Sequence, residues 1–311
     1  MSAQRPDAKS DASVSAHDPD RMFAVIVNYF SADLVGDLLS SLRVADFNTV
    51  IIVDNSANSQ EEVRIRSLAC EAGAEVLTLE SNVGFGPAVN RGVRKLSIDD
   101  GARIWILNPD TRPEPLAATM LVDAMERYSA DLVSPVLTTG ASGDAVWFAG
   151  GVFDATYGRS RHLTEVPAVA EEFSFLTAAA LMITGRAWRL LEGFREDLFM
   201  YWEDADLSVR ANSLGLKMLL VPEARVWHAV GATSSEVGRS ELFHYYMQRN
   251  RVIVLGELFG IRYLFGILRL FEALKLVRRA LGEPTGKFGK AYRSCIGFTD
   301  GLKMAVGRGS R

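Results

Sequence analysis

Short apolar runs alternate with amphipathic segments through the first 130 residues. The apolar runs are rich in β-branched residues, as in strands buried on both faces, and they lie at residues 22–30, 49–54, 74–80 and 103–110. The segments between and after them have the spacing of helices with one apolar face, and they lie at residues 31–42, 59–73, 86–96 and 115–128. This alternation predicts an α/β fold, with a mainly parallel sheet flanked by helices.

Polar residues follow the predicted strands. Asn28, Asp54, Asn82 and Asp110 each come where an apolar run ends. Asn and Asp also start ordinary turns, so one such residue alone says little. In an open α/β sheet, however, ligands bind beyond the carboxyl ends of the strands, and the recurrence predicts a site at this edge.

Asp110 is the candidate metal ligand of this edge. It follows the run Ile104–Leu107 in the sequence Asn108-Pro109-Asp110, where the proline fixes φ and stiffens the approach. Mg²⁺ takes one or two protein carboxylates and completes its shell with water and substrate phosphates. A divalent cation, Mg²⁺ or Mn²⁺, is therefore expected at Asp110.

A cluster of acids lies in the second half of the chain. Glu203, Asp204 and Asp206 follow Tyr201 and Trp202 directly. Acids are also favoured at a helix N-terminus through the helix dipole, which is the alternative explanation. The aromatic flank favours a carboxylate whose pKa is raised by desolvation, as in a general base.

Two further features bear on the ligand. Residues 81–92 contain Gly84, Gly86 and Gly92, but neither their spacing nor their place after the third strand fits a dinucleotide fingerprint. The glycines still permit close approach of the backbone to a ligand. His228 ends another apolar strand, where a structural role and a metal or phosphate role both remain open.

Composition limits the remaining choices. The chain has 311 residues, of which 48% are hydrophobic, enough for one large or two small domains. Cys70 and Cys295 fit neither a disulfide framework nor a metal motif, which favours a reducing, cytoplasmic compartment. Residues 1–21 are mostly small and polar and show no secretory signal, so we expect a disordered tail there.

The ordered set of motifs resembles inverting family 2 glycosyltransferases of the GT-A fold, of the bacterial rhamnosyltransferase-like kind. The resemblance covers about residues 23–250 and rests on VIVNYFSADLVGDLLSSL, IIVDNSA, NVGFGPAVNRG, WILNPDT, VWFAGGVFD, FLTAAALMITGRAW, LFMYWEDADLSVRANSLG and VPEARVWHAVGATSS. It implies a GT-A domain over residues 22–250, followed by a helical extension over 251–311.

The resemblance also implies roles for individual residues. Asp204 corresponds to the catalytic base, with Trp202 and Glu203 on the acceptor side. Asp110, with His228 nearby, corresponds to the site of the metal and the diphosphate. The nucleotide-sugar would be contacted by Asn28, Tyr29, Asp54, Asn82, Gly84, Asn90, Asn108, Asp110 and Arg249.

Two departures from the family pattern stand out. Asn108 replaces the first acid of the Asp-x-Asp motif, which puts a two-carboxylate metal site in doubt. Arg195 stands where an acidic residue is usual, a change in an acceptor-side loop. The implied mechanism is unchanged: Asp204 deprotonates an acceptor hydroxyl, which displaces the nucleoside diphosphate with inversion.

The C-terminal segment differs from the body in charge. Residues 251–311 carry 12 basic and 4 acidic side chains, against 22 and 34 in residues 1–250. Residues 261–282 place an apolar stripe on one predicted helix, formed by Tyr263, Ile267, Leu270, Leu274, Val277 and Leu281. We expect peripheral contact with anionic membrane at its inner face. Packing on the body or on a second subunit of a homodimer is the alternative, and nucleic acid is not expected as a partner.

The substrates follow from the resemblance alone. The favoured donor is dTDP-L-rhamnose, with another nucleotide-activated hexose as the alternative. The acceptor would be a saccharide, free or linked to polyprenyl diphosphate, in cell-surface polysaccharide synthesis. A nicotinamide-dependent oxidoreductase and a non-catalytic sugar-nucleotide binding protein are the other classes left open.

Overall fold

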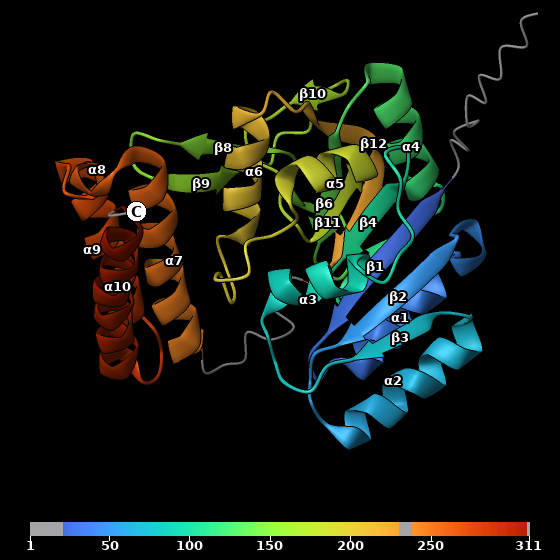
Figure 1. Cartoon of the computed structure of the whole chain (residues 1–311), viewed down its shortest axis with the longest axis horizontal. Coiled ribbons are helices and arrows are strands. Elements are labelled where there is room, and N and C mark those ends of the chain that lie inside the picture. Colours follow the sequence, from blue (N-terminus) through green and yellow to red (C-terminus); the bar gives the residue numbers. More distant parts are fainter. Residues whose placement is uncertain (1–20, 230–237, 310–311) are drawn as a thin grey trace, which may run out of the picture.

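The computed structural model describes residues 21–229 and 238–309, and a ten-stranded sheet forms its centre (Figure 1). Its strands are β1 (Met22–Asn28), β2 (Thr49–Asp54), β3 (Glu75–Thr78), β4 (Arg103–Leu107), β5 (Thr111–Pro113), β6 (Leu132–Thr139), β7 (Ala145–Phe148), β10 (Glu171–Glu172), β11 (Ala180–Thr184) and β12 (Met218–His228). They run in the order β10-β12-β6-β11-β4-β1-β2-β3, with β5 paired to β12 and β7 to β6. The expected tail at residues 1–20 lies outside the described residues.

The strands predicted from the apolar runs form the parallel half of this sheet. β1 pairs in parallel with β2 and β4, and β2 pairs in parallel with β3. Residues Phe23 to Val27 of β1 are buried, as expected for a strand covered on both faces. The register places Asn28 beside Asp54, so the polar ends of β1 and β2 meet at one edge, as predicted.

The other half of the sheet is mixed. β11 lies antiparallel between β4 and β6, while β12 runs parallel to β6 and antiparallel to β5 and β10. β12 thereby carries His228 to the position opposite Thr111, next to Asp110. The pairing of strands distant in sequence therefore assembles the candidate metal site.

The helices of the body follow the predicted alternation. They are α1 (Ala32–Ser41), α2 (Ser59–Ala72), α3 (Phe85–Val93), α4 (Ala117–Tyr128), α5 (Gly185–Leu191) and α6 (Glu203–Ser213), with a short 3-10 turn at Val44–Asp46. α2 starts where the Asn58 side chain accepts the backbone N–H groups of Gln60 and Glu61. α3 packs tightly on the sheet, since a Cβ at Gly92 would lie 2.8 Å from Val25 and Val53.

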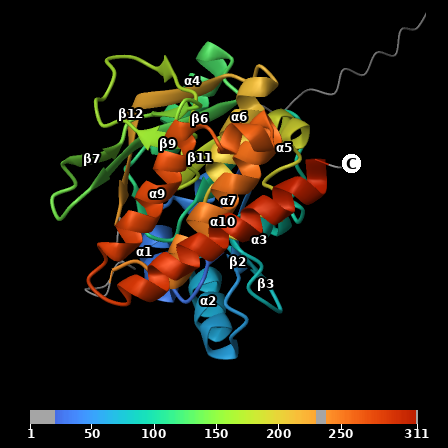
Figure 2. The ribbon, with the colours of Figure 1, turned by 90° about the vertical axis from the view of Figure 1, so that its left-hand side faces the viewer.

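The C-terminal segment is a layer of helices beside the sheet domain (Figures 1 and 2). Its members are α7 (Glu241–Phe259), α8 (Ile261–Leu264), α9 (Ile267–Leu281) and α10 (Lys287–Gly309). α10 packs closely on α7, because a Cβ at Gly297 would lie 2.3 Å from the carbonyl oxygen of Tyr245. The boundary expected between residues 250 and 251 falls inside α7. None of the helices within residues 21–229 and 238–309 combines the length and apolarity needed to cross a membrane.

The prediction of a single helix over residues 261–282 is wrong in two respects. The chain breaks at Phe265–Gly266, so α8 and α9 are separate helices. The outward stripe also differs from the prediction: Leu270 and Val277 are half-buried, while Phe271 is exposed with Ile267 and Leu274. Spacing alone cannot tell which of two apolar edges of a helix packs on the body.

A two-stranded hairpin joins the two parts of the molecule. It consists of β8 (Gly151–Asp154) and β9 (Arg159–His162), and it extends from the sheet toward α8 and α9 (Figure 1). Arg251 of α7 is fully buried and donates hydrogen bonds to the carbonyl oxygens of Gly158 at 2.8 Å and Tyr157 at 3.0 Å. The tip of the hairpin is therefore fixed to the C-terminal helices.

Candidate active site

The ends of β1 and β2 form a buried polar cluster. The Asn28 amide donates to Asp54 Oδ1 at 3.1 Å and to Glu61 Oε1 at 3.2 Å. Asp54 Oδ2 is buried and has no hydrogen-bond partner among the described residues. Because a buried carboxylate oxygen without a donor is costly, Asp54 is suited to accept an N–H or O–H from a ligand.

The sequence reasoning missed Glu61, which orients Asn28. Glu61 belongs to the buried face of α2, together with Ile65 and Ala69. An acid within the buried stripe of a helix is the signal that would have revealed it, since buried charges need partners. Glu61 also accepts the backbone N–H of Ala32 at 2.9 Å and so ties α1 to the cluster.

Two aromatic side chains lie exposed just beyond this cluster. Tyr29 and Phe30 follow β1 directly, and Phe30 has a left-handed backbone with φ of 51°. Their rings contact each other edge to face, with centroids 5.0 Å apart. An exposed ring beside this polar cluster can stack on a planar base, and the expected contact of Tyr29 with the nucleotide stays a prediction.

Asn55 organises the glycine loop that precedes α3 and was not foreseen. Its amide donates to Asn82 Oδ1 at 2.9 Å, and its oxygen accepts the backbone N–H of Val83. Gly84 has φ of 93°, and a Cβ there would lie 2.1 Å from the carbonyl oxygen of Phe199. Only glycine allows this contact, which joins the predicted donor loop to the loop before the acidic cluster.

Asn90 is buried and holds the same loop. Its amide donates to the carbonyl oxygen of Phe194 at 2.8 Å and to Glu196 at 3.2 Å, and its oxygen accepts the Phe194 N–H. Both amide protons are thus used within the protein. The structure assigns Asn90 a packing role, and its contact with a nucleotide stays a prediction.

Asp110 and His228 are brought together as predicted. Asp110 Oδ1 lies 3.1 Å from His228 Nε2, and His228 Nδ1 is buried without a partner among the described residues. The His228 ring also contacts Trp147 edge to face at 4.8 Å. Across residues 21–229 and 238–309, no group of three or more His, Cys, Asp and Glu residues forms a metal cage.

Asp110 Oδ1 and His228 Nε2, which face each other, offer two ligands to an ion that takes its other ligands from the substrate. Asn108 is placed in the turn before Asp110, where its carbonyl oxygen accepts the Thr111 hydroxyl at 2.6 Å. Asn108 supplies no carboxylate here, so Asp110 is the acid of the NPD segment that is available to an ion. A divalent cation at Asp110 would depend on diphosphate oxygens from the donor.

Glu203 and Asp204 begin α6 after an unusual turn. Tyr201 and Trp202 have consecutive left-handed backbones, with φ of 66° and 72°. Non-glycine residues in this region store strain, typically about 1–3 kcal/mol each, and such residues cluster at functional sites. The turn thus directly precedes Glu203 and Asp204, the first two residues of α6.

Burial raises the pKa of both acids. The pKa of Glu203 rises to about 8 through desolvation and then through the charge of Asp204. Desolvation raises the pKa of Asp204 to about 6, partly offset by hydrogen bonds from the backbone N–H groups of Ala205 and Ala178 and from the Thr177 hydroxyl. Asp204 accepts these hydrogen bonds, whereas Glu203 Oε2 is buried without a partner among the described residues, so Asp204 is the acid expected to ionise first.

Activity that depends on ionised Asp204 should fall as the pH drops below about 6. In Glu203→Gln the acidic limb should stay near the same pH, because Glu203 is already neutral when Asp204 titrates. The measurement is kcat/KM against pH for both proteins. An acidic limb that disappears in Glu203→Gln would move the base to Glu203.

Residues of α7 hold the turn in place. The Asn250 amide donates to the carbonyl oxygens of Met200 and Tyr201, at 2.8 Å each. Arg249 is buried and donates to the carbonyl oxygen of Asp197 at 2.7 Å. Arg249 thus positions the acceptor-side loop, and its contact with a diphosphate stays a prediction.

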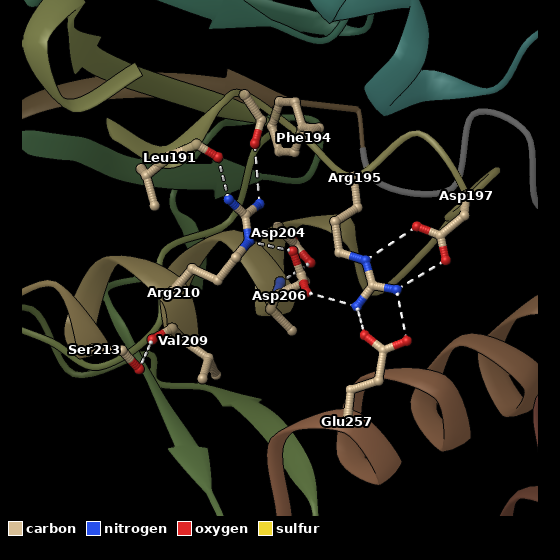
Figure 3. Close-up of polar contacts among 12 residues, drawn as sticks. Leu191, Phe194, Arg195, Asp197, Asp204, Asp206, Val209, Arg210, Ser213 and Glu257 are labelled. Atoms are coloured by element: carbon tan, nitrogen blue, oxygen red, sulfur yellow. Dashed lines mark hydrogen bonds and ion pairs between the residues drawn. The ribbon is translucent and has the colours of Figure 1, made fainter. Parts of the chain in front are cut away.

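Arg195 connects three segments through its guanidinium (Figure 3). It lies 2.8 Å from Asp197, 2.6 Å from Glu257 of α7 and 3.4 Å from Asp206 of α6. Asp206 is buried and also pairs with Arg210 at 2.7 Å. The third acid of the cluster is therefore structural, and the departure at Arg195 ties α6 to α7.

Comparison with known proteins identifies the family. The sequence profile described as glycosyl transferase family 2 matches residues 23–180, just over half of the chain. The chain belongs to glycosyl transferase family 2. A second profile, glycosyl transferase family group 2, matches residues 103–286. Membership of this family excludes the alternative that the chain is a nicotinamide-dependent oxidoreductase.

One sequence relative and two crystal structures support this assignment. The chain is 25% identical over 233 residues to the N-acetylglucosaminyl-diphospho-decaprenol L-rhamnosyltransferase of Mycobacterium tuberculosis, covering 67% of this chain and 76% of the relative. Crystal structures of GalNAc-T7 with UDP, GalNAc and Mn²⁺ (TM-score 0.60, 16% identity, 91% of this chain and 56% of that one) and of S. aureus TarS 1-349 (TM-score 0.54, 13% identity, 94% and 92%) share its fold. The predicted GT-A fold is confirmed.

Proposed function

We propose that this family 2 glycosyltransferase moves L-rhamnose from dTDP-L-rhamnose, with inversion, onto a saccharide linked to polyprenyl diphosphate. The observation that carries the proposal is the buried Glu203–Asp204 pair, in which burial raises the pKa of both acids while Asp204 accepts hydrogen bonds from the Ala205 and Ala178 N–H groups and the Thr177 hydroxyl. The contact of Gly84 and Phe85 with Phe199 joins the loop of this pair to the predicted donor loop. A base and a donor site on touching loops are what a single displacement needs.

The residues divide the reaction between them. Asp204 takes the proton of an acceptor hydroxyl as its oxygen forms a bond to the anomeric carbon. The bond from that carbon to the diphosphate breaks on the opposite face, and the leaving group carries the electron pair away. Asp54 and Tyr29 contact the nucleotide, and Asn28 orients the Asp54 carboxylate through the hydrogen bond that its amide donates. A divalent cation held by Asp110 and His228 would supply charge neutralisation for the diphosphate.

The donor is supported by the likeness to a rhamnosyltransferase, whose name also includes a diphospho-decaprenol acceptor. Ligands that bind the folded state raise its apparent stability, so a panel of nucleotide sugars tests the choice. We expect dTDP-rhamnose to give the largest shift in Tm and to release dTDP on incubation with acceptor. A shift with a UDP-sugar and none with dTDP-rhamnose would change the donor, and binding without release would indicate a non-catalytic protein.

Contact with anionic membrane through the C-terminal helices is the remaining part of the proposal. Ile267 and Leu274 of α9 are 82% and 67% exposed, and Lys275 and Arg278 lie beside them. Basic residues near an anionic surface contribute about 1 kcal/mol each, less in salt, while apolar insertion is not screened.

Binding to vesicles with anionic lipid is therefore expected to weaken at high salt without vanishing. Deleting residues 251–311 would remove part of α7 from the core, so point changes are the cleaner test. Ile267→Asp with Leu274→Asp should reduce binding sharply, whereas Leu190→Asp on α5, at a residue 51% exposed, should not. Equal binding by all three proteins would assign the face to another contact.

A further inference from the structure

An open groove lies between the β8–β9 hairpin and α9. It has a volume of about 630 Å³, and its apolar side chains are Tyr157 of the hairpin and Phe271 and Leu276 of α9. Figures 1 and 2 both place α9 beside this hairpin. Phe271 is 62% exposed, so a large aromatic surface faces the solvent here. The groove lies outside the catalytic residues described above.

Basic side chains surround this apolar surface. Arg159, Lys275, Arg278 and Arg279 line the groove, against one acid, Glu272. Glu272 is shared, because it lies 3.3 Å from Arg159 and 3.6 Å from Lys275. Within the part of the chain that the structure describes, Arg278 and Arg279 form no ion pair. The groove thus combines an apolar floor with an excess of positive charge.

The region around Arg279 is electrostatically unfavourable without an anion. Burial lowers the pKa of Arg279, and the charge of Arg239 lowers it further, while Glu283 compensates in part. Both guanidinium groups lie over the ring of Phe243, Arg239 at 4.7 Å and Arg279 at 5.9 Å. A multivalent anion at this end of the groove would relieve their repulsion.

Both walls of the groove lead to the acceptor side of the active site. Phe243, beneath Arg279, contacts Tyr201 edge to face at 5.0 Å. Phe153 of the hairpin contacts Trp202 edge to face at 6.5 Å. Tyr201 and Trp202 directly precede Glu203 and Asp204. Each wall of the groove is therefore connected to the turn that carries the base through one aromatic ring.

The groove is also held in a fixed shape. Arg251, fully buried, donates to the carbonyl oxygens of Tyr157 and Gly158 on one wall and of Arg269 at 3.2 Å on the other. One side chain thereby fixes the hairpin tip relative to the start of α9. A preformed site loses less conformational entropy when its ligand binds.

We propose that this groove binds the diphosphate and the first isoprene units of the lipid-linked acceptor. The guanidinium groups of Arg278 and Arg279 receive the diphosphate, and Phe271, Leu276 and Tyr157 receive the hydrocarbon. The sugar on the diphosphate then extends past Tyr201 toward Asp204. The inference rests on the proposed lipid-linked acceptor and adds the place where its lipid end is recognised.

Farnesyl diphosphate, a short soluble polyprenyl diphosphate, is the probe. Its binding to the full chain is measured by calorimetry in the absence of vesicles and with saturating dTDP, which occupies the nucleotide site. We expect farnesyl diphosphate to bind at least about 10-fold more tightly than inorganic diphosphate or farnesol, because only farnesyl diphosphate engages both the cations and the apolar floor.

The variant Phe271→Asp with Arg278→Glu should weaken farnesyl diphosphate binding at least about 10-fold. The matched control is Phe288→Asp with Lys303→Glu on α10, which changes one exposed aromatic and one exposed base outside the groove. The control should bind as the unmodified chain does. An unchanged Tm shift with dTDP in both variants shows that the fold is intact.

The outcomes separate this inference from the proposed function. If the groove variant binds farnesyl diphosphate as the unmodified chain does, or if farnesol or inorganic diphosphate binds equally well, the inference is wrong. If the chain ignores farnesyl diphosphate and the variant loses only vesicle binding, the face contacts the membrane surface instead. A failure of sugar transfer with intact, variant-sensitive farnesyl diphosphate binding would count against the proposed reaction and not against the groove.

Discussion

Replacing Asp204 by Asn is expected to reduce sugar transfer by about 100- to 10,000-fold, the usual contribution of a general base. The substitution keeps the shape of the side chain, so the hydrogen bond from the Ala205 N–H at 2.8 Å can persist. The amide cannot accept the proton of the acceptor hydroxyl, which is the step that requires a base. The affinity for dTDP should stay within a few-fold, since Asp54 and Asn28 lie on other elements.

Glu203→Gln is the matched control for this variant. It changes the neighbouring acid in the same desolvated turn, but Glu203 is already protonated near neutral pH. We expect it to retain much more activity than Asp204→Asn when the rate of dTDP release is measured with saturating acceptor. Turnover of Asp204→Asn within a few-fold of the unmodified chain would exclude Asp204 as the base.

Replacing Asp110 by Ala should reduce kcat/KM by at least about 100-fold, as when a group that stabilises developing charge is removed. Asp110 is the carboxylate at the end of the NPD segment, and its partner His228 offers only ring nitrogens. Without Asp110 the site therefore lacks the oxygen ligand that a hard cation prefers. The loss should appear in binding of the intact diphosphate donor and much less in binding of the bare nucleoside. Chelation of divalent ions should reproduce it in the unmodified chain.

Asp123→Ala on α4, which removes an exposed carboxylate, serves as the control and should leave both affinities unchanged. The measurement is calorimetric titration of donor and nucleoside, with and without chelator. Full activity in the presence of chelator would show the metal assignment to be wrong. Basic side chains would then have to bind the diphosphate.

The parallel half of the fold could be predicted because its signals are local. β1 and β2 are apolar runs that end at Asn28 and Asp54, and the apolar run of β4 is followed by Asn108. The alternation with helices determines the direction of all three strands. The meeting of Asn28 with Asp54 follows from parallel register. The chemistry expected at Asp110 follows from the same reasoning.

Features formed by residues distant in sequence could not be predicted. The clamp from Asn250 to the Tyr201 turn spans 49 residues, and the bond from Arg251 to Gly158 spans 93. Nothing in either local sequence marks such a partner, because the need for it arises only when the elements pack. The break between α8 and α9 was missed for a related reason. The helical spacing of apolar residues continues across Phe265–Gly266, although the backbone is not helical there.

A single displacement with Asp204 as the base inverts the anomeric carbon, so the anomeric configuration of the product distinguishes this mechanism from its alternatives. The purified chain is incubated with dTDP-L-rhamnose and a lipid-linked saccharide, and the product is examined by NMR before side reactions accumulate. We expect the configuration at the transferred anomeric carbon to be inverted relative to the donor. Retention of configuration would contradict it, because retention requires two displacements or a front-face attack that one base at Asp204 does not provide.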